Sequence, residues 1–288
     1  MDHSPYIYLG IFALVAFLLK ALILFHTHIR SYISKCFAVL CLFFLVQNAA
    51  EFLGFFTYMG GQVAVGVFLV HIYMVALYFI FPAVLQLALA MGGSPNARRI
   101  SMANFSIAAL IALAHSSGYV ISGFEFLSWT VITSPGEYYV LAMLYILLNS
   151  LAAVGYLTVK TVLSKDFEVR ERTRVNLIAM APLFMVAFGV ILLRLQGFNS
   201  SSAISLPIAT TLFLFVLLLQ TNGNLFWLSL RLKSIIEILK IKDLSSIDQI
   251  IDRLDEVRIR QALRATNGSQ RNTAQLIKLS EPTLSRRI

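Results

Sequence analysis

Long apolar runs separated by short polar segments fill the first 228 residues of the chain. An apolar run of about 20 residues has the length of a helix that crosses a lipid bilayer. The pattern therefore predicts seven membrane helices, at 6–26, 35–59, 63–91, 101–121, 137–160, 175–195 and 204–228. Pro82 falls inside the third run, where a kinked helix is expected.

A different pattern follows the last apolar run, with charged residues between apolar ones at helical spacing. It predicts a first helix that begins near Ile247 and ends at Asn267, next to a glycine that favours helix termination. A second, short helix is expected at 270–277, followed by a tight turn at Lys278. Ser280 is placed to cap a last helix. The expected fold class is thus all-α: a seven-helix transmembrane bundle followed by a small three-helix domain.

Composition and charge divide the chain in the same way. Hydrophobic residues make up 58% of the chain and charged residues only 13%, whereas a typical soluble domain has about 25% charged residues. Residues 229–288 nevertheless hold 12 of the 23 Lys and Arg residues and 7 of the 14 Asp and Glu residues. We therefore expect a membrane domain at 1–228, a linker or stalk helix at 229–246 and a helical domain at 247–288.

The basic residues between the expected spans alternate from loop to loop. The first, third and fifth loops contain Lys or Arg, as does the segment after the seventh span, whereas the second, fourth and sixth loops contain none. Loops rich in Lys and Arg stay on the cytoplasmic side of a membrane. The alternation predicts an N-terminus outside and a C-terminus in the cytoplasm, where DNA is accessible to the helical domain.

The C-terminal segment resembles the Fis-type helix-turn-helix of bacterial enhancer-binding regulators over residues 254–288. The motifs that carry the resemblance are Ala262-Leu263, Thr266-Asn267-Gly268-Ser269, Thr273-Ala274, Leu279-Ser280 and Thr283-Leu284-Ser285-Arg286-Arg287-Ile288. In that family the last helix enters the major groove of DNA as part of a dimer. The resemblance thus implies DNA as a partner and a homodimer as the functional form.

By position, the resemblance assigns a set of polar residues to phosphates or base edges: Ser269, Gln270, Arg271, Ser280, Glu281, Thr283, Ser285, Arg286 and Arg287. Two residues depart from the family. Lys278 stands at a turn where the family usually has glycine, and a left-handed backbone there costs about 1 kcal/mol. Glu281 stands where basic or longer polar side chains are frequent; it repels phosphate but offers an acceptor to a cytosine amino group. A helical protein-interaction domain is the alternative interpretation.

Between the membrane domain and the tail, Leu228, Leu232, Ile235 and Leu239 alternate by four and three residues. This spacing is that of a coiled-coil seam, over fewer than two heptads. One interpretation is a short dimer stalk that sets the distance between two recognition helices. The other is an amphipathic helix on the membrane surface, with its basic residues near lipid phosphates.

Polar side chains inside the expected spans are the candidates for a stimulus-binding site, because such residues are costly in lipid. The expected orientation places these residues in the middle or outer part of the bundle: Gln47, Asn48, Glu51, His71, Tyr73, His115, Tyr145, Asn149 and Arg194. Their similar depth predicts a pocket for a small or lipophilic ligand, with Glu51 as its charged anchor. Hydrogen bonding between packed helices is the alternative role. Lys20, in the inner half of the first span, is expected to extend toward the headgroups.

The membrane part, about residues 6–228, is also similar to the seven-helix N-terminal sensor region of some bacterial histidine kinases. The features that carry this similarity are Thr133-Ser134-Pro135-Gly136 before Tyr138-Tyr139, the basic residues Arg170, Arg172 and Arg174, and Pro182 inside the sixth span. Residues 229–288 are too few for the dimerisation and ATP-binding domains of a kinase, so the expected output is DNA binding by the same chain.

Together these patterns predict a one-component transcription regulator in the bacterial inner membrane, in contact with lipid. A transporter or channel, or a receptor with a protein-interaction tail, is the alternative, although no internal repeat stands out. A retinal photoreceptor is disfavoured because the seventh span contains no lysine. The sequence has no HExxH, GxSxG or paired aspartates, so no enzyme is expected. Cys36 and Cys41 match no metal motif and are expected in the core; no metal or cofactor is predicted.

Overall fold

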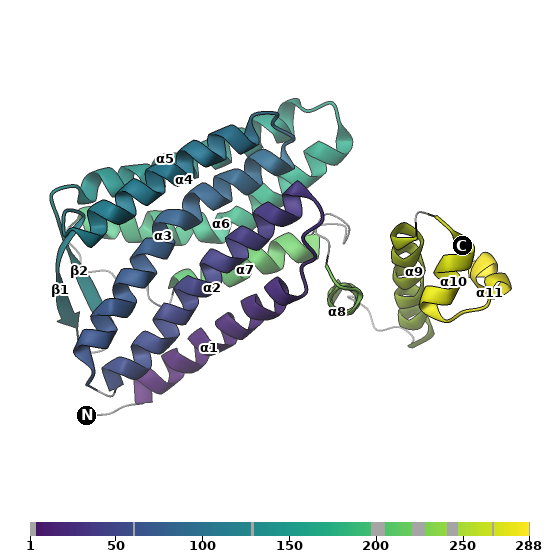
Figure 1. The fold of residues 1–288 in the computed structure, drawn as a ribbon, viewed down its shortest axis with the longest axis horizontal. Coiled ribbons are helices and arrows are strands. Elements are labelled where there is room, and N and C mark those ends of the chain that lie inside the picture. The colour runs from purple at the N-terminus through teal and green to yellow at the C-terminus, as the bar shows by residue number, and fades with distance from the viewer. Residues whose placement is uncertain are drawn as a thin grey trace.

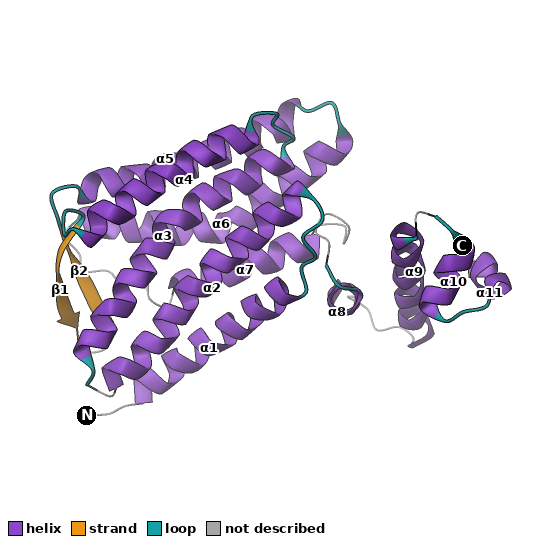
Figure 2. Ribbon diagram, in the orientation of Figure 1, coloured by secondary structure: helices purple, strands orange, loops and turns teal. Residues whose placement is uncertain are grey.

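The structure, a computed structural model, describes residues 4–59, 61–127, 130–196, 205–220, 228–240, 247–266 and 268–287. These residues are mostly helical, with one pair of strands (Figure 2). The helices are α1 (Ser4–Phe25), α2 (Tyr32–Met59), α3 (Val63–Met91), α4 (Ala97–Ser116), α5 (Tyr139–Leu163), α6 (Phe167–Leu195), α7 (Ser205–Gln220), α8 (Leu230–Lys240), α9 (Ile247–Ala265), α10 (Gln270–Ile277) and α11 (Glu281–Arg287). The strands are β1 (Ile121–Leu127) and β2 (Thr130–Pro135). At this coarse level the expected all-α class is confirmed.

Helices α1 to α7 lie side by side in one bundle (Figure 1). The central helix is α3, which packs against α2, α4, α5 and α6. Its second half continues through Pro82 and is buried at most positions. Helix α7 packs against both α6 and α1, so the last helix of the bundle returns to the first. The core between them is formed by apolar side chains from nearly all of these helices.

Helices α2, α3, α4 and α5 are each long and apolar enough to cross a membrane, judged by length and composition. Shorter apolar stretches lie in α1 and α7, at Gly10–Phe25 and Leu206–Leu219. A helix covers most of each of the seven expected spans. Large apolar side chains of α1, α4 and α5 are exposed, which suits lipid rather than water as the surrounding medium. These are the properties of a membrane protein.

The segment between α4 and α5 differs from the loop expected at 122–136. Strands β1 and β2 pair antiparallel, with Glu125 opposite Ile132 and an irregularity between Ile121 and Gly123. Aromatic and β-branched residues in this segment favour extended structure. The segment contains no Lys or Arg, which predicts the outer side of the membrane. This pattern carries no information about strand pairing. The all-α expectation is therefore incomplete at this point.

Gly136 joins the hairpin to α5 where two backbone segments touch. A Cβ at this position would lie 2.4 Å from the Tyr119 carbonyl oxygen, so no larger residue fits without a shift of the backbone. The N–H groups of Gly136 and Tyr138 donate to the carbonyl oxygens of Val120 and Tyr119, each at 2.9 Å. The motif at 133–136 therefore has a local role, because it lets the chain enter α5 against the end of α4.

Helix α8 lies between the bundle and the C-terminal helices, and contacts α7 and α9. Leu228 and Leu232 are buried in the bundle core. Leu228 also forms an isolated antiparallel bridge with Thr27. The next residue, Ser229, donates its N–H to the His26 carbonyl oxygen at 2.7 Å. The start of α8 is therefore attached to the residues that directly follow α1.

Helices α9, α10 and α11 form a small unit with a core of its own. Its buried residues are Ile259, Ala262, Ala274, Ile277 and Leu284, with Leu263 and Leu279 packed against them. Helix α9 begins at Ile247 and α10 occupies 270–277, as the sequence pattern predicts. Asn267, the expected end of the first helix, lies outside the described residues, and α9 ends at Ala265.

Candidate functional site

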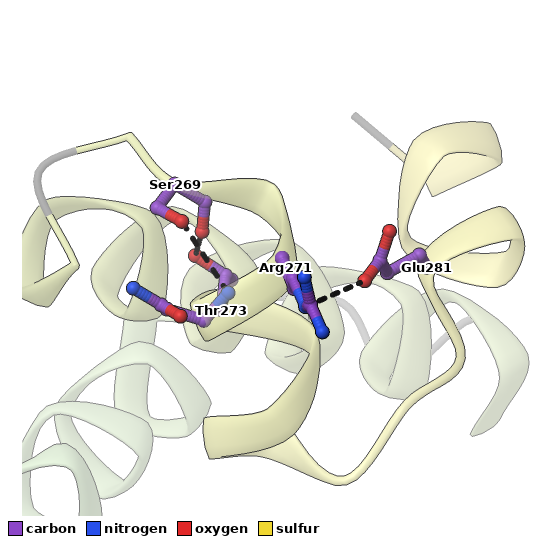
Figure 3. A network of polar contacts seen from close by, with 5 residues as sticks. Ser269, Arg271, Thr273 and Glu281 are labelled. Atoms are coloured by element: carbon purple, nitrogen blue, oxygen red, sulfur yellow. Dashed lines mark hydrogen bonds and ion pairs between the residues drawn. The ribbon is translucent and has the colours of Figure 1, made fainter.

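Side-chain caps fix the start of α10 in the C-terminal unit. The Ser269 side-chain oxygen accepts from the Asn272 N–H at 3.4 Å. The Thr273 hydroxyl donates to the Ser269 carbonyl oxygen at 2.7 Å, a contact visible in Figure 3. The same hydroxyl lies 2.5 Å from the hydroxyl of Thr266, the residue after α9. These bonds hold the start of α10 against the end of α9.

The turn between α10 and α11 is left-handed at Lys278, with φ 60° and ψ 40°. Elsewhere in the described chain, positive φ occurs only at glycines. The Leu279 N–H donates to the Ala274 carbonyl oxygen at 2.9 Å and closes the end of α10. The backbone geometry that glycine adopts freely is therefore present, and lysine carries its steric cost.

Helix α11 is oriented by one cap and one buried side chain. The Ser280 hydroxyl accepts from the Thr283 N–H at 3.3 Å and lies 2.7 Å from the Thr283 hydroxyl. Leu284 is fully buried in the core that α11 shares with α9 and α10. Because Leu284 faces inward, α11 turns Ser285 and Arg286 outward, and both are exposed.

Most of the residues expected to face DNA are on the surface. The exposed ones are Gln270, Arg271, Ser280, Glu281, Ser285 and Arg286, and the half-buried ones are Ser269 and Thr283. The Arg287 side chain lies outside the described residues. Arg271 and Glu281 face each other, with 3.9 Å between Arg271 Nε and Glu281 Oε1 (Figure 3). Glu281 therefore partly neutralises the exposed cation of α10.

Charge is distributed unevenly within this unit. Helix α9 carries four basic and four acidic residues, whereas the segment at 268–288 carries four basic residues and one acidic residue. The surplus of positive charge thus belongs to α10, α11 and the turn between them. A basic surface of this kind attracts an anionic partner.

A second polar region lies inside the bundle at Lys20. Its side chain is fully buried, and its ammonium donates to Asn48 Oδ1, to the Thr211 hydroxyl at 2.7 Å and to the Pro207 carbonyl oxygen at 3.3 Å. The expectation that Lys20 extends toward the headgroups is wrong, because three acceptors on α2 and α7 satisfy its three donors inside the bundle. Pro207 and Thr211 are distant in sequence, so no local pattern indicates this site.

Glu51 lies one turn beyond Asn48 on α2 and is only 7% exposed. Among the described residues, neither of its carboxylate oxygens has a hydrogen-bond partner, and the same is true of Gln47 Nε2 and Asn48 Nδ2. Glu51 is close enough to Lys20 for electrostatic attraction. The three residues expected on one face of the second span are thus gathered near a buried cation. A buried carboxylate without donors is costly, which makes this group responsive to a proton, a ligand or a helix movement.

His71 of α3 and His115 of α4 meet at the end of the bundle next to the hairpin. His71 Nδ1 lies 2.8 Å from His115 Nε2, and the Tyr78 hydroxyl lies 3.3 Å from His115 Nδ1. Phe124 of β1 stacks edge-on against His71, with ring centroids 4.9 Å apart. Only one of two facing nitrogens at this distance carries a proton. The sequence indicated both histidines as site residues but not Tyr78. Tyr78 lies inside an apolar run, where nothing distinguishes it from a tyrosine that only packs.

Of the remaining candidates, Tyr145 joins α5 to α4, whereas Asn149 bonds within α5. The Tyr145 hydroxyl donates to the Asn104 carbonyl oxygen of α4 at 2.8 Å, and Asn149 Nδ2 donates to the Tyr145 carbonyl oxygen at 2.9 Å. Tyr73 is half-buried against the bundle core, and the Arg194 side chain lies outside the described residues. The hydrogen-bonded candidates therefore belong to sets on α1, α2 and α7, on α3 and α4, and on α4 and α5.

Within the described residues, no group of three or more His, Cys, Asp or Glu side chains is placed to hold a metal ion. Cys36 and Cys41 are free thiols in the core. No family model, no curated protein and no solved structure matches this chain. Its function is therefore inferred from the side chains and contacts described above.

Proposed function

We propose that the chain is a membrane-integrated one-component transcription regulator, with a seven-helix sensor domain and a cytoplasmic Fis-type helix-turn-helix. The observation that carries this proposal is the geometry of α10, Lys278 and α11. Two short capped helices are joined by a left-handed turn and packed on α9 through Leu284. This is the arrangement in which a second, recognition helix enters the major groove.

The exposed side chains of α11 have the chemistry for DNA recognition. Arg286 is exposed on the face opposite Leu284, and an arginine there can donate to two acceptors of a guanine or to a phosphate. Ser285 can contact either a base edge or the backbone. Arg271 of α10 supplies a further cation near α11. The Fis-type resemblance assigns DNA contacts to these same three residues.

The membrane topology in this proposal has N-terminus outside and C-terminus inside. The start of α1 and the hairpin lie at one end of the bundle, and α8 to α11 lie at the other (Figure 1). Basic residues of the odd-numbered connections, including Arg98 at the start of α4 and Arg170 at the start of α6, belong to the end that carries α8. Such residues favour the cytoplasmic side. The seven spans comprise the four long apolar helices together with α1, α6 and α7.

The direct test is selective DNA binding by the full-length protein in lipid nanodiscs, with genomic fragments as the ligand pool. Arg286→Ala is expected to weaken binding of the selected sequence about 5- to 150-fold, the range for loss of a base contact. Arg260→Ala is the matched control, because Arg260 is an exposed arginine of α9 paired with Glu256. Binding that lacks sequence selectivity, or equal loss in both variants, contradicts the proposal.

A transporter or channel is the second candidate function, favoured by Lys20 and Glu51. Charged residues buried between membrane helices often mark the path of an ion or substrate. The measurement that separates the two functions is flux of protons or small cations into liposomes that contain the full chain. Flux that depends on Glu51, together with no selective DNA binding, would establish the transporter and reject the regulator.

A further inference from the structure

Helix α8 has one face on the bundle and another face that is exposed among the residues that the structure describes. Leu232 and Ile236 are buried in the bundle core. Ile235, Ile238 and Leu239 are 49%, 44% and 57% exposed and, at spacings of three and four residues, form one apolar face. Leu228 and Leu232 of the expected dimer seam are thus occupied by the bundle, whereas Ile235 and Leu239 are not.

The orientation of α8 relative to the spans bears on whether its exposed apolar face contacts lipid or water. Figure 1 shows α8 nearly end-on, whereas the bundle helices run across the view. Helix α8 is therefore roughly perpendicular to the spans and parallel to the plane of a membrane that they cross. Its start is fixed at the bundle end by the bond from Ser229 to His26 and the bridge from Leu228 to Thr27. Helix α8 thus lies at the depth where the spans emerge from the bilayer.

The lipid-facing surface of α1 ends directly before this attachment. Leu18, Leu22 and Phe25 form an exposed stripe along the last turns of α1, and the next residues, His26 and Thr27, hold the start of α8. The start of α8 is therefore attached where an exposed apolar surface of α1 ends.

The charge near α8 also complements a membrane. Residues 228–242 contain four basic residues and one acidic residue. Of the two basic side chains that the structure describes there, Arg231 is exposed and Lys233 is buried. Amphipathic helices with an apolar face and flanking cations lie in the headgroup region of anionic bilayers.

We propose that α8 is an interfacial helix, with Ile235, Ile238 and Leu239 in the acyl-chain boundary and the Arg231 guanidinium at anionic lipid headgroups. This proposal rests on the membrane crossing of the proposed function but not on DNA binding. Because α8 contacts both the bundle and α9, the lipid surface becomes a third partner in setting the position of the C-terminal unit.

The test is nitroxide labelling of Ile238→Cys in the full-length protein, in nanodiscs with and without phosphatidylglycerol. We expect the nitroxide at position 238 to be more accessible to dissolved oxygen than to an aqueous nickel chelate. We also expect it to lie deeper in the discs that contain phosphatidylglycerol. Gln275→Cys, at an exposed position of α10, is the aqueous control and is expected to show the reverse preference. Unmodified protein measures any background from Cys36 and Cys41, which are buried.

Two results overturn the proposal. Access of the nickel chelate to position 238 in both kinds of disc means that the face is in water, and spin coupling between labels of two copies means that a dimer covers it. Leu148→Cys shows whether a negative result concerns α8 alone or the proposed membrane crossing. Leu148 is exposed on α5, and a label there must contact lipid if α5 crosses the bilayer. DNA binding by the labelled protein is measured separately.

Discussion

Replacement of Lys278 by glycine is expected to stabilise the C-terminal unit by about 1 kcal/mol. Lys278 has φ 60° and ψ 40°, and a left-handed conformation costs a residue with a Cβ about 1–2 kcal/mol. Glycine removes that cost but loses more backbone freedom on folding, which offsets about 0.5–1 kcal/mol. The Lys278 side chain is exposed, so its removal leaves no cavity and isolates the backbone effect.

Hydrogen exchange of the full chain in nanodiscs measures this change locally. The amides of Leu279 and Leu284, bonded to the carbonyl oxygens of Ala274 and Ser280, report opening of the turn and of α11. A gain of about 1 kcal/mol slows their exchange about fivefold where they exchange by local unfolding. Amides of α3 are the internal reference and are expected to stay unchanged.

Two further substitutions at position 278 test the backbone conformation separately. Lys278→Asn is expected to fall between lysine and glycine, because asparagine tolerates the left-handed region better than most residues. Lys278→Val is expected to speed exchange, because a β-branched side chain is least compatible with it. Asparagine also removes the positive charge, which separates charge from backbone conformation. Equal exchange in all variants, or faster exchange with glycine, refutes the left-handed turn.

Three other changes test the candidate sites. Glu281→Gln is expected to tighten DNA binding several-fold in titrations at fixed salt, because it removes a charge that repels phosphate and faces Arg271; weaker binding would instead assign Glu281 to a base contact. Lys20→Met is expected to lower stability in detergent by about 1–3 kcal/mol, because it leaves the buried Asn48 Oδ1 without its donor and removes the cation that attracts the Glu51 carboxylate. The addition of Glu51→Gln should recover part of the loss, and no recovery contradicts their coupling. His115→Ala is expected to cost about 1–3 kcal/mol in thermal unfolding, because it leaves the buried Tyr78 hydroxyl and the half-buried His71 without their partner, and an unchanged midpoint contradicts that network.

The helices of the bundle were predictable because lipid leaves few alternatives. A long apolar run must satisfy its backbone internally, and a helix does so within the run itself. The run around Pro82 illustrates this, because α3 continues through the proline. The hairpin at 121–135 was not predictable in the same way, because pairing depends on two short segments and on the close approach at Gly136. The tail was predictable where local chemistry decides, as at the Ser280 cap.

The site at Lys20 could not be predicted from the sequence. A lone lysine near the end of an apolar run reads as a residue that extends to the headgroups, because the free energy of a buried ammonium depends on acceptors that the local sequence does not reveal. Here they come from Asn48 and from Thr211 and Pro207 of α7. Helix packing thus reverses the expected direction of the side chain. The same holds for His71 and His115, which are 44 residues apart but share a hydrogen bond.

The contacts near the C-terminal end of α1 offer a route by which a stimulus in the bundle would reach the C-terminal unit. Lys20 binds α1 to α2 and α7, and two turns later His26 and Thr27 hold the residues that begin α8. Helix α8 in turn contacts α9. A shift of α1 relative to α7 must therefore either break the Lys20 hydrogen bonds or move α8 with it. A stimulus drives such a shift only if it binds the two arrangements with different affinity. Glu51 is well suited to create that difference, because any ligand or proton that satisfies its carboxylate also weakens its attraction to Lys20.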